Sequence, residues 1–252
     1  MIDIHCHILH NIDDGPSSLE KAEEMLRCAS RDGIKEIITT PHFSADTLKN
    51  IKSRLDELAP AARECGIKLH SGCEYTLSDL SESKTPLTMA ESMFILVDLN
   101  SSYIPQFMES FAFDLSLKGY RIILAHPEKL LSPRNMHQMI DLHKHGIFFQ
   151  VNAASINGKS GKIAKKFTEK MITAGICDYI ASDAHSLQHR SFEMQQARSR
   201  ITDLFGRTAT ELTFDINPRL LLQNIEPETI SFKRKSILTS FKRCFIPRKA
   251  TI

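Results

Sequence analysis

The sequence contains no tryptophan and no apolar run approaching the ~18 residues of a transmembrane helix. No positively charged segment followed by an apolar stretch stands at the amino terminus, so we expect no signal peptide. A G-x-G-x-x-G motif is also absent, and a dinucleotide cofactor is therefore not indicated.

Cysteine is sparse and scattered. The six cysteines form no C-x-x-C pair, and we interpret them as reduced thiols of a cytoplasmic protein. None is followed six residues later by arginine, which excludes the C-x5-R loop of cysteine-based phosphatases.

Charge is unevenly distributed. The formal net charge is +2, but residues 233–252 hold seven Lys and Arg and no acidic residue. The remainder has 25 basic and 30 acidic residues, which argues against a general nucleic-acid binder. In the segment 228–252, apolar residues recur near helical spacing between the cations. A peripheral contact with the inner membrane face, docking on a kinase or another subunit, and a solvated tail all stay open.

Short apolar segments alternate with amphipathic ones along residues 1–227, with no linker rich in Gly, Pro or Ser, so we expect one domain there. Strands are predicted at 2–6, 34–40, 67–75, 93–99, 121–126, 147–154 and 178–185. Helices are predicted near 17–31, 46–65, 104–118, 134–144, 160–174, 190–205 and 216–223. This alternation indicates an α/β fold with parallel strands. Seven strands favour a closed or nearly closed barrel, whose site lies at the carboxyl ends of the strands.

The residues at those strand ends are almost all histidine or carboxylate. Residues i and i+2 of a strand share a face, so His5 and His7 can present two imidazoles side by side. Asn152 ends the sixth strand. The candidate metal ligands are His5, His7, Asp14, His42, Glu74, Asp98, His126, Asp183 and His185.

Imidazole and carboxylate without thiolate suit Mn, Fe or Zn. Nine ligands exceed the needs of one ion, and two or three ions fit better. Three divalent ions and four carboxylates leave a net charge of about +2, which favours an anionic substrate such as a phosphate dianion. The expected reaction is hydrolysis of a phosphoester by metal-bound hydroxide, without a covalent enzyme intermediate.

Six sequence blocks carry a specific resemblance. They are MIDIHCHILHNIDDGP (1–16), TTPHF (39–43), GCEY (72–75), LAHPEK (124–129), ASDAH (181–185) and INPR (216–219). In this order the chain resembles the polymerase-and-histidinol-phosphatase (PHP) family of metal-dependent phosphoesterases. Within it, the chain is similar to the bacterial tyrosine phosphatases encoded with capsular and exopolysaccharide genes.

The resemblance implies a distorted (β/α)7 TIM-like barrel with three metal ions, usually manganese. The first ion would take His5, His7, Glu74 and Asp183, the second Glu74, Asp98 and His126, and the third Asp14, His42 and His185. The basic residues that hold the phosphate would be Lys129 and Arg190. The family has Glu at the position of Asp98 and Arg at that of Lys129, so the second ion and the grip on phosphate are expected to differ.

The implied function is a protein-tyrosine phosphatase that acts on the tyrosine-rich tail of a membrane polysaccharide-export kinase. Two alternatives stay open: a small-molecule phosphatase such as histidinol-phosphate phosphatase, and a non-catalytic metal-stabilised scaffold that binds a kinase or the membrane. The sequence also leaves open whether the chain forms a homo-oligomer.

Several further residues have a structural interpretation. His143 and His145 repeat the His-x-His spacing at a predicted helix end, where i and i+2 diverge, so we reject them as ligands. Asp13 is predicted to be a turn residue, and Glu128 either orients a ligand or forms a surface salt bridge. The run 157–160 resembles the end of a phosphate-binding loop, but it lacks the preceding Gly and is predicted to be a turn.

Overall fold

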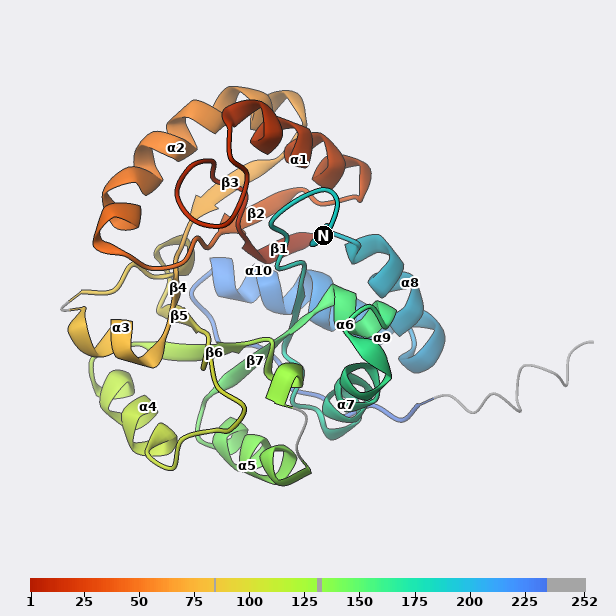
Figure 1. Ribbon diagram of the computed structural model, residues 1–252. Coiled ribbons are helices and arrows are strands. Elements are labelled where there is room, and N and C mark those ends of the chain that lie inside the picture. Colours follow the sequence, from red (N-terminus) through yellow and green to blue (C-terminus); the bar gives the residue numbers. More distant parts are fainter. Residues whose placement is uncertain (84, 131–132, 235–252) are drawn as a thin grey trace, which may run out of the picture.

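The structure is a computed structural model that describes residues 1–83, 85–130 and 133–234. Its strands are β1 (Ile2–Cys6), β2 (Glu36–Thr39), β3 (Lys68–Ser71), β4 (Glu74–Tyr75), β5 (Phe94–Val97), β6 (Arg121–Ala125), β7 (Phe148–Asn152) and β8 (Tyr179–Ala181). Its α-helices are α1 (Leu19–Arg31), α2 (Ala45–Glu64), α3 (Leu77–Glu82), α4 (Met108–Leu117), α5 (Pro133–Lys144), α6 (Ala153–Asn157), α7 (Gly161–Ala174), α8 (Met194–Phe205), α9 (Arg207–Glu211) and α10 (Asn217–Leu222). Helices surround the strands, as Figure 1 shows.

All strand pairs are parallel and form two sheets, in the orders β1-β2-β3 and β4-β5-β6-β7-β8. Backbone hydrogen bonds join the sheets where their strands end. On one side, Glu74 N donates to Pro41 O at 3.0 Å; on the other, Asp183 N donates to His5 O at 2.8 Å. The predicted parallel α/β fold is confirmed, and its ring of strands is distorted at these two seams.

One predicted strand, 67–75, is divided into β3 and β4. The interruption is at Gly72, where a Cβ would lie 3.0 Å from Ile38 Cγ2 and 3.1 Å from Thr39 O. The chain therefore passes close to β2 and leaves the first sheet before Glu74 enters the second one. This step places the Glu74 side chain at the boundary between the sheets.

Alternation along the strands divides the apolar residues into two clusters. One fills the inside of the ring with side chains such as Ile4, Leu96 and Ile123, and Leu221 of α10 packs against it. The other includes Ile95, between the strands and the surrounding helices. Strands such as β5 and β6 are buried on both faces and are therefore almost wholly apolar, whereas β3 (KLHS) is partly exposed.

Local signals place the helices close to their predicted positions. The α1 helix begins after the N-cap Ser18, whose side chain accepts from Lys21 N. Its buried residues, Ala22, Met25, Leu26 and Ala29, recur at helical spacing. The short helices α3 and α6 were not predicted, because each has only five or six residues.

The chain after α10 returns along the body. Buried Asn217 donates through Nδ2 to Asp178 O (2.9 Å) and Glu228 O (3.0 Å) and accepts from Glu228 N (2.9 Å). Arg234 pairs with Glu169 at 3.1 Å. Most of the predicted tail, 235–252, lies outside the described residues. Within the described part of the chain, no helix has the length and apolar character needed to cross a membrane.

We predict that Asn217→Ala lowers the free energy of unfolding by about 1–3 kcal/mol, because it leaves the buried Asp178 carbonyl without its donor and releases the Glu228 backbone. Urea denaturation measures the loss. The control is Asn50→Ala on the exposed face of α2, expected to change stability by less than about 0.5 kcal/mol. Equal effects of the two substitutions would contradict this role of Asn217.

Candidate metal centre

The ends of the strands bring all nine predicted ligands to one side of the ring. They follow or end strands as predicted, except that Glu74 begins β4. His126 and Asp183 have positive φ values of 35° and 55°, which turn the chain sharply as each strand ends. Non-glycine residues adopt this conformation only when the surroundings hold them there, a feature that concentrates at functional sites.

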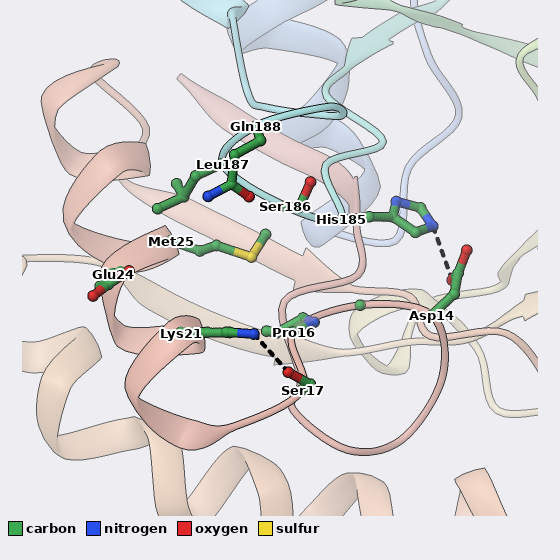
Figure 2. Close-up of a pocket in the computed structure, with 11 residues that line it drawn as sticks. Asp14, Pro16, Ser17, Lys21, Glu24, Met25, His185, Ser186, Leu187 and Gln188 are labelled. Atoms are coloured by element: carbon green, nitrogen blue, oxygen red, sulfur yellow. Dashed lines mark hydrogen bonds and ion pairs between the residues drawn. The ribbon is translucent and has the colours of Figure 1, made fainter.

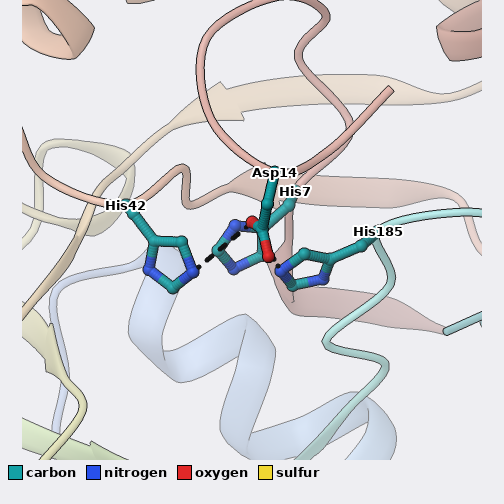
Figure 3. A group of neighbouring side chains, drawn as sticks. All are labelled: His7, Asp14, His42 and His185. Carbon is teal, nitrogen blue, oxygen red and sulfur yellow. Dashed lines mark ion pairs between the residues drawn. The ribbon is translucent and has the colours of Figure 1, made fainter. Parts of the chain in front are cut away.

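Three overlapping groups of side chains have potential ligand atoms within 4.8 Å of one another. The groups are His5, His7 and Glu74; Glu74, Asp98 and His126; and His7, Asp14, His42 and His185, the last drawn in Figure 3. The second group equals the second set implied by the resemblance, whereas the first group lacks the predicted Asp183. His7 in addition lies close to the third set, where its ring stacks on His185 with centroids 3.8 Å apart.

In the buried part of the centre, nitrogen and oxygen atoms of several side chains lie close together. His5 Nε2 lies 3.2 Å from His7 Nε2 and 3.4 Å from both Glu74 Oε1 and Asp183 Oδ1. Two imidazole nitrogens at this distance share at most one proton, and a cation between them would satisfy both lone pairs. The site therefore fits a metal ion through the chemistry of its donors.

Two further side chains orient the imidazoles. Gln150 Oε1 lies 2.8 Å from His5 Nδ1, and Asp13 Oδ2 lies 2.6 Å from His7 Nδ1. Each places the Nδ1 proton on its own side and leaves Nε2 facing the centre. Asn152 Nδ2 likewise donates to Asp183 Oδ2 at 2.7 Å. Gln150 was not predicted, because its position in an apolar strand carries no signal of a partner 145 residues away.

Asp13 forms the predicted turn and also binds the ligand His7. Its Oδ1 accepts from Gly15 N, as a turn residue does, while Oδ2 binds His7 and accepts from His42 N. Gly15 is required here, since a Cβ would meet His7 O at 2.3 Å. The Asp13-Asp14-Gly15 turn thus supplies two carboxylates: Asp13 orients His7, and Asp14 belongs to the third group of candidate ligands.

The electrostatics of the centre favour bound cations. Burial opposes ionisation of Glu74, but His5 and His126 outweigh it and hold its pKa well below the usual range. Burial lowers the pKa of His7, yet its bonds to Asp13 and Glu74 raise it to about 10. The buried carboxylates are therefore ionised and attract positive charge, which protons supply where metal ions do not.

The third group is more accessible than the first. Asp14 Oδ1 lies 3.1 Å from His185 Nε2 and 3.5 Å from His42 Nε2, and the side chains of Asp14 and His42 are 57% and 46% exposed. Burial, together with the charge of His7, lowers the pKa of His185 to about 3. The His185 imidazole is therefore neutral and available as a ligand beside the opening.

Both predicted phosphate-binding residues reach the centre. Arg190 Nη2 lies 2.7 Å from Asp183 Oδ1, and its Nη1 lies 3.7 Å from Asp14 Oδ2. Lys129 Nζ lies 3.8 Å from Asp183 Oδ2. The two cations thus approach one carboxylate from the solvent side, where an anion would enter.

A hollow of about 210 Å³ opens beside the third group (Figure 2). It lies between the start of α1 and the loop after β8, and Asp14 and His185 form one of its walls. Met25 and Leu187 supply apolar surface, and Lys21 donates to Ser17 at 2.8 Å on the other wall. A substrate larger than inorganic phosphate has room here.

The side chains excluded from the sequence-based site stay outside it. His143 binds buried Asp178 at 2.9 Å, and His145 is exposed near Glu109. The 157–160 run is a turn between α6 and α7, with Gly158 at φ 88°. The surface salt bridge considered for Glu128 is wrong: this residue is fully buried and accepts from Asn152 N and Ser155 Oγ. Because the 127–130 turn folds it inward, it supports the end of β7.

The fold and the side chains at the strand ends define a parallel α/β protein with three overlapping groups of candidate metal ligands. The chain belongs to the family described as capsular polysaccharide synthesis, CpsB/CapC, whose model matches residues 1–223. The resemblance drawn from the six sequence blocks is thereby confirmed.

Curated relatives carry names of one kind. The tyrosine-protein phosphatase YwqE of Bacillus subtilis is 34% identical over 238 residues, covering 89% of this chain and 92% of its own. The putative tyrosine-protein phosphatase CapC of Staphylococcus aureus is 33% identical over 208 residues, covering 78% and 81%.

Solved structures agree with the fold. The structure of YwqE from B. subtilis and CpsB from Streptococcus pneumoniae, described as unique metal-dependent tyrosine phosphatases, matches with a TM-score of 0.83 and 30% identity, covering 94% of this chain and 100% of that one. The lactonase Lmo2620 of Listeria monocytogenes, at 13% identity, covers 90% and 92% with a TM-score of 0.55 and shares the fold alone.

Divalent metal is predicted to stabilise the chain. At about 100 times the dissociation constant it should add about 2.7 kcal/mol, which raises Tm by about 5–10 °C for a chain of this size. Thermal melts of chelator-treated protein with and without Mn²⁺ measure the shift. A His5→Ala/His7→Ala variant should lose it, whereas exposed His145→Ala should keep it. An equal shift in all three proteins would contradict the site.

Asp13→Asn is predicted to weaken metal binding about 10–100-fold, because the neutral amide cannot hold the His7 ring as the carboxylate does. Metal titration by calorimetry gives the affinity, with exposed Asp203→Asn as the matched control. An unchanged metal affinity in Asp13→Asn would show that Asp13 only forms the turn and does not orient His7 for metal binding.

Proposed function

We propose that this chain is a metal-dependent protein-tyrosine phosphatase. The observation that carries the proposal is the convergence of three groups of histidine and carboxylate ligands with two cations, Arg190 and Lys129, at one opening. The name of the relative YwqE, a tyrosine-protein phosphatase, supports the proposal.

The proposed cofactor is three manganese ions, with iron or zinc as substitutes. The first would be held by His5, His7, Glu74 and Asp183, the second by Glu74, Asp98 and His126, and the third by Asp14, His42 and His185. Bound divalent ions supply Lewis acidity to a water molecule and to phosphate oxygens. The nitrogen and oxygen donors, without thiolate, suit these metals.

The roles of the remaining residues follow from their positions. Arg190 would bind phosphate oxygens with its planar guanidinium, while Lys129 would add a single point charge. Gln150 and Asp13 would keep His5 and His7 oriented throughout turnover. These residues bind and position the substrate and the ligands.

The thiols nearest the centre are unsuited to attack phosphorus. Cys6 Sγ points to Ala184 O and Cys73 Sγ to Pro41 O. Burial raises the pKa of both thiols, so neither forms a thiolate near neutral pH. This supports direct hydrolysis without a phosphocysteine intermediate.

Asp98, a ligand of the proposed second ion, is less well placed than the ligands of the first ion. Asp98 Oδ1 lies 3.9 Å from His126 Nδ1 and also accepts from Asn100 N at 2.8 Å. The shorter Asp side chain is thus partly engaged with its own loop. We propose that the second ion binds less tightly than the first.

We also propose the domain bounds, the physiological substrate and the cellular location. Residues 1–227 would form the phosphatase domain and 228–252 a basic tail. The substrate would be a phosphotyrosine protein of capsule synthesis, namely a membrane polysaccharide-export kinase. The protein would act in the cytoplasm or at the inner membrane face. Membrane contact through the tail and self-association are further proposals.

With added Mn²⁺, the protein is expected to hydrolyse a phosphotyrosine peptide at a higher kcat/KM than histidinol phosphate, measured by phosphate release. Removing metal with EDTA should abolish turnover, and restoring Mn²⁺ should recover it. The His5→Ala/His7→Ala variant should lose about a hundredfold or more, because the first ion loses two ligands. Metal-loaded protein that fails to hydrolyse the peptide would refute the proposal, and preference for histidinol phosphate would favour the small-molecule alternative.

A further inference from the structure

A second hollow, of about 200 Å³, is lined in part by Arg190. It shares Lys129, Asp183 and Arg190 with the candidate metal centre and continues outward to Lys159 and Glu193. The hollow is therefore an extension of the opening through which a phosphate would enter.

Side chains that bind anions dominate this hollow. Besides Lys129 and Arg190 it is lined by Lys159 and His189, and Ser160 and Ser191 add hydroxyl groups. Its two acidic residues are engaged: Asp183 by Arg190 and Asn152, and Glu193 by Lys159. Its surface chemistry therefore suits a second negative group next to the phosphate.

Lys159 and Glu193 form the outer wall. The side chain of Lys159 is 62% exposed, whereas that of Glu193 is 17% exposed and also accepts from Asn157 Nδ2 at 3.5 Å. Because Lys159 is largely solvated and Glu193 keeps the Asn157 donor, Lys159 can exchange its partner for an incoming carboxylate.

We propose that this hollow binds the carboxylate of an acidic residue that flanks the phosphotyrosine in the substrate chain. The inference rests on the proposed phosphatase function and adds a sequence preference to it. With the phosphate at Arg190 and Lys129, the neighbouring residue's carboxylate would face Lys159. The hollow of Figure 2 is less suited to this group, because Met25 and Leu187 line it and Glu24 stands at its wall.

The test uses two phosphotyrosine peptides that differ only in having Glu or Gln on both sides of the phosphotyrosine. The measured quantity is the ratio of their kcat/KM values, which cancels effects on the chemical step. We expect the full-length, metal-loaded protein to prefer the Glu peptide by about three- to tenfold, less at high salt, because exposed charges are screened.

Three variants separate the contributions. Lys159→Ala should bring the ratio close to one, and Glu193→Gln should raise it, because it removes the competing carboxylate and preserves the side chain's shape. Lys162→Ala removes an exposed lysine of α7 that lies three residues further along the chain and outside the hollow, and it should leave the ratio as it is.

A ratio near one in the unaltered protein, or an unchanged ratio in Lys159→Ala, would overturn the inference while leaving the phosphatase function intact. No turnover of either peptide by metal-loaded protein would overturn the proposed function, and the sequence preference with it.

Discussion

The pairing of β1 with the segment that follows β8 is the contact on which the candidate metal centre depends. Asp183 N donates to His5 O and His7 N donates to Ala184 O, so the two ends of the domain interleave. These bonds set His5 and His7 beside Asp183 and His185, 178 residues along the chain. The same seam closes the ring of strands, and stability and ligand geometry therefore rest on one set of backbone hydrogen bonds.

Buried carboxylates need nearby groups that compensate their charge, and the structure supplies such groups at increasing distance from the carboxylates. Glu74 and Asp183 are almost fully buried, and imidazoles surround them. Gln150 and Asp13 hold those imidazoles from behind, while Arg190 approaches from solvent. Polarity thus increases from the apolar ring interior to the opening, where Asp14 and His42 of the third group are exposed and the two hollows reach solvent.

How much of the site could be predicted depended on the kind of signal. His5 and His7 share a strand face by local geometry alone, and each later ligand stands at the end of an apolar strand, where a parallel barrel must gather it. Gln150 carried no such signal, because packing between distant segments sets it beside His5. Asp13 lies only six residues from His7, but the irregular loop that joins them follows no periodic pattern from which the contact could be predicted. Glu128 looked like a surface residue in sequence, yet a short helical turn after β6 carries it inward.

The sequence by itself determined the parallel α/β class, the nine candidate ligands and the family, because strand periodicity and residue type are local properties. Only the tertiary structure decided that 67–75 divides at Gly72, that Asp13 orients His7, and that Lys159 stands across a hollow from Arg190. The first and the third result from close approach between segments remote in the chain, whereas Asp13 is held six residues from His7 by a loop that also brings it to His42 N. Excluded volume and hydrogen bonding select these contacts only once the fold is formed.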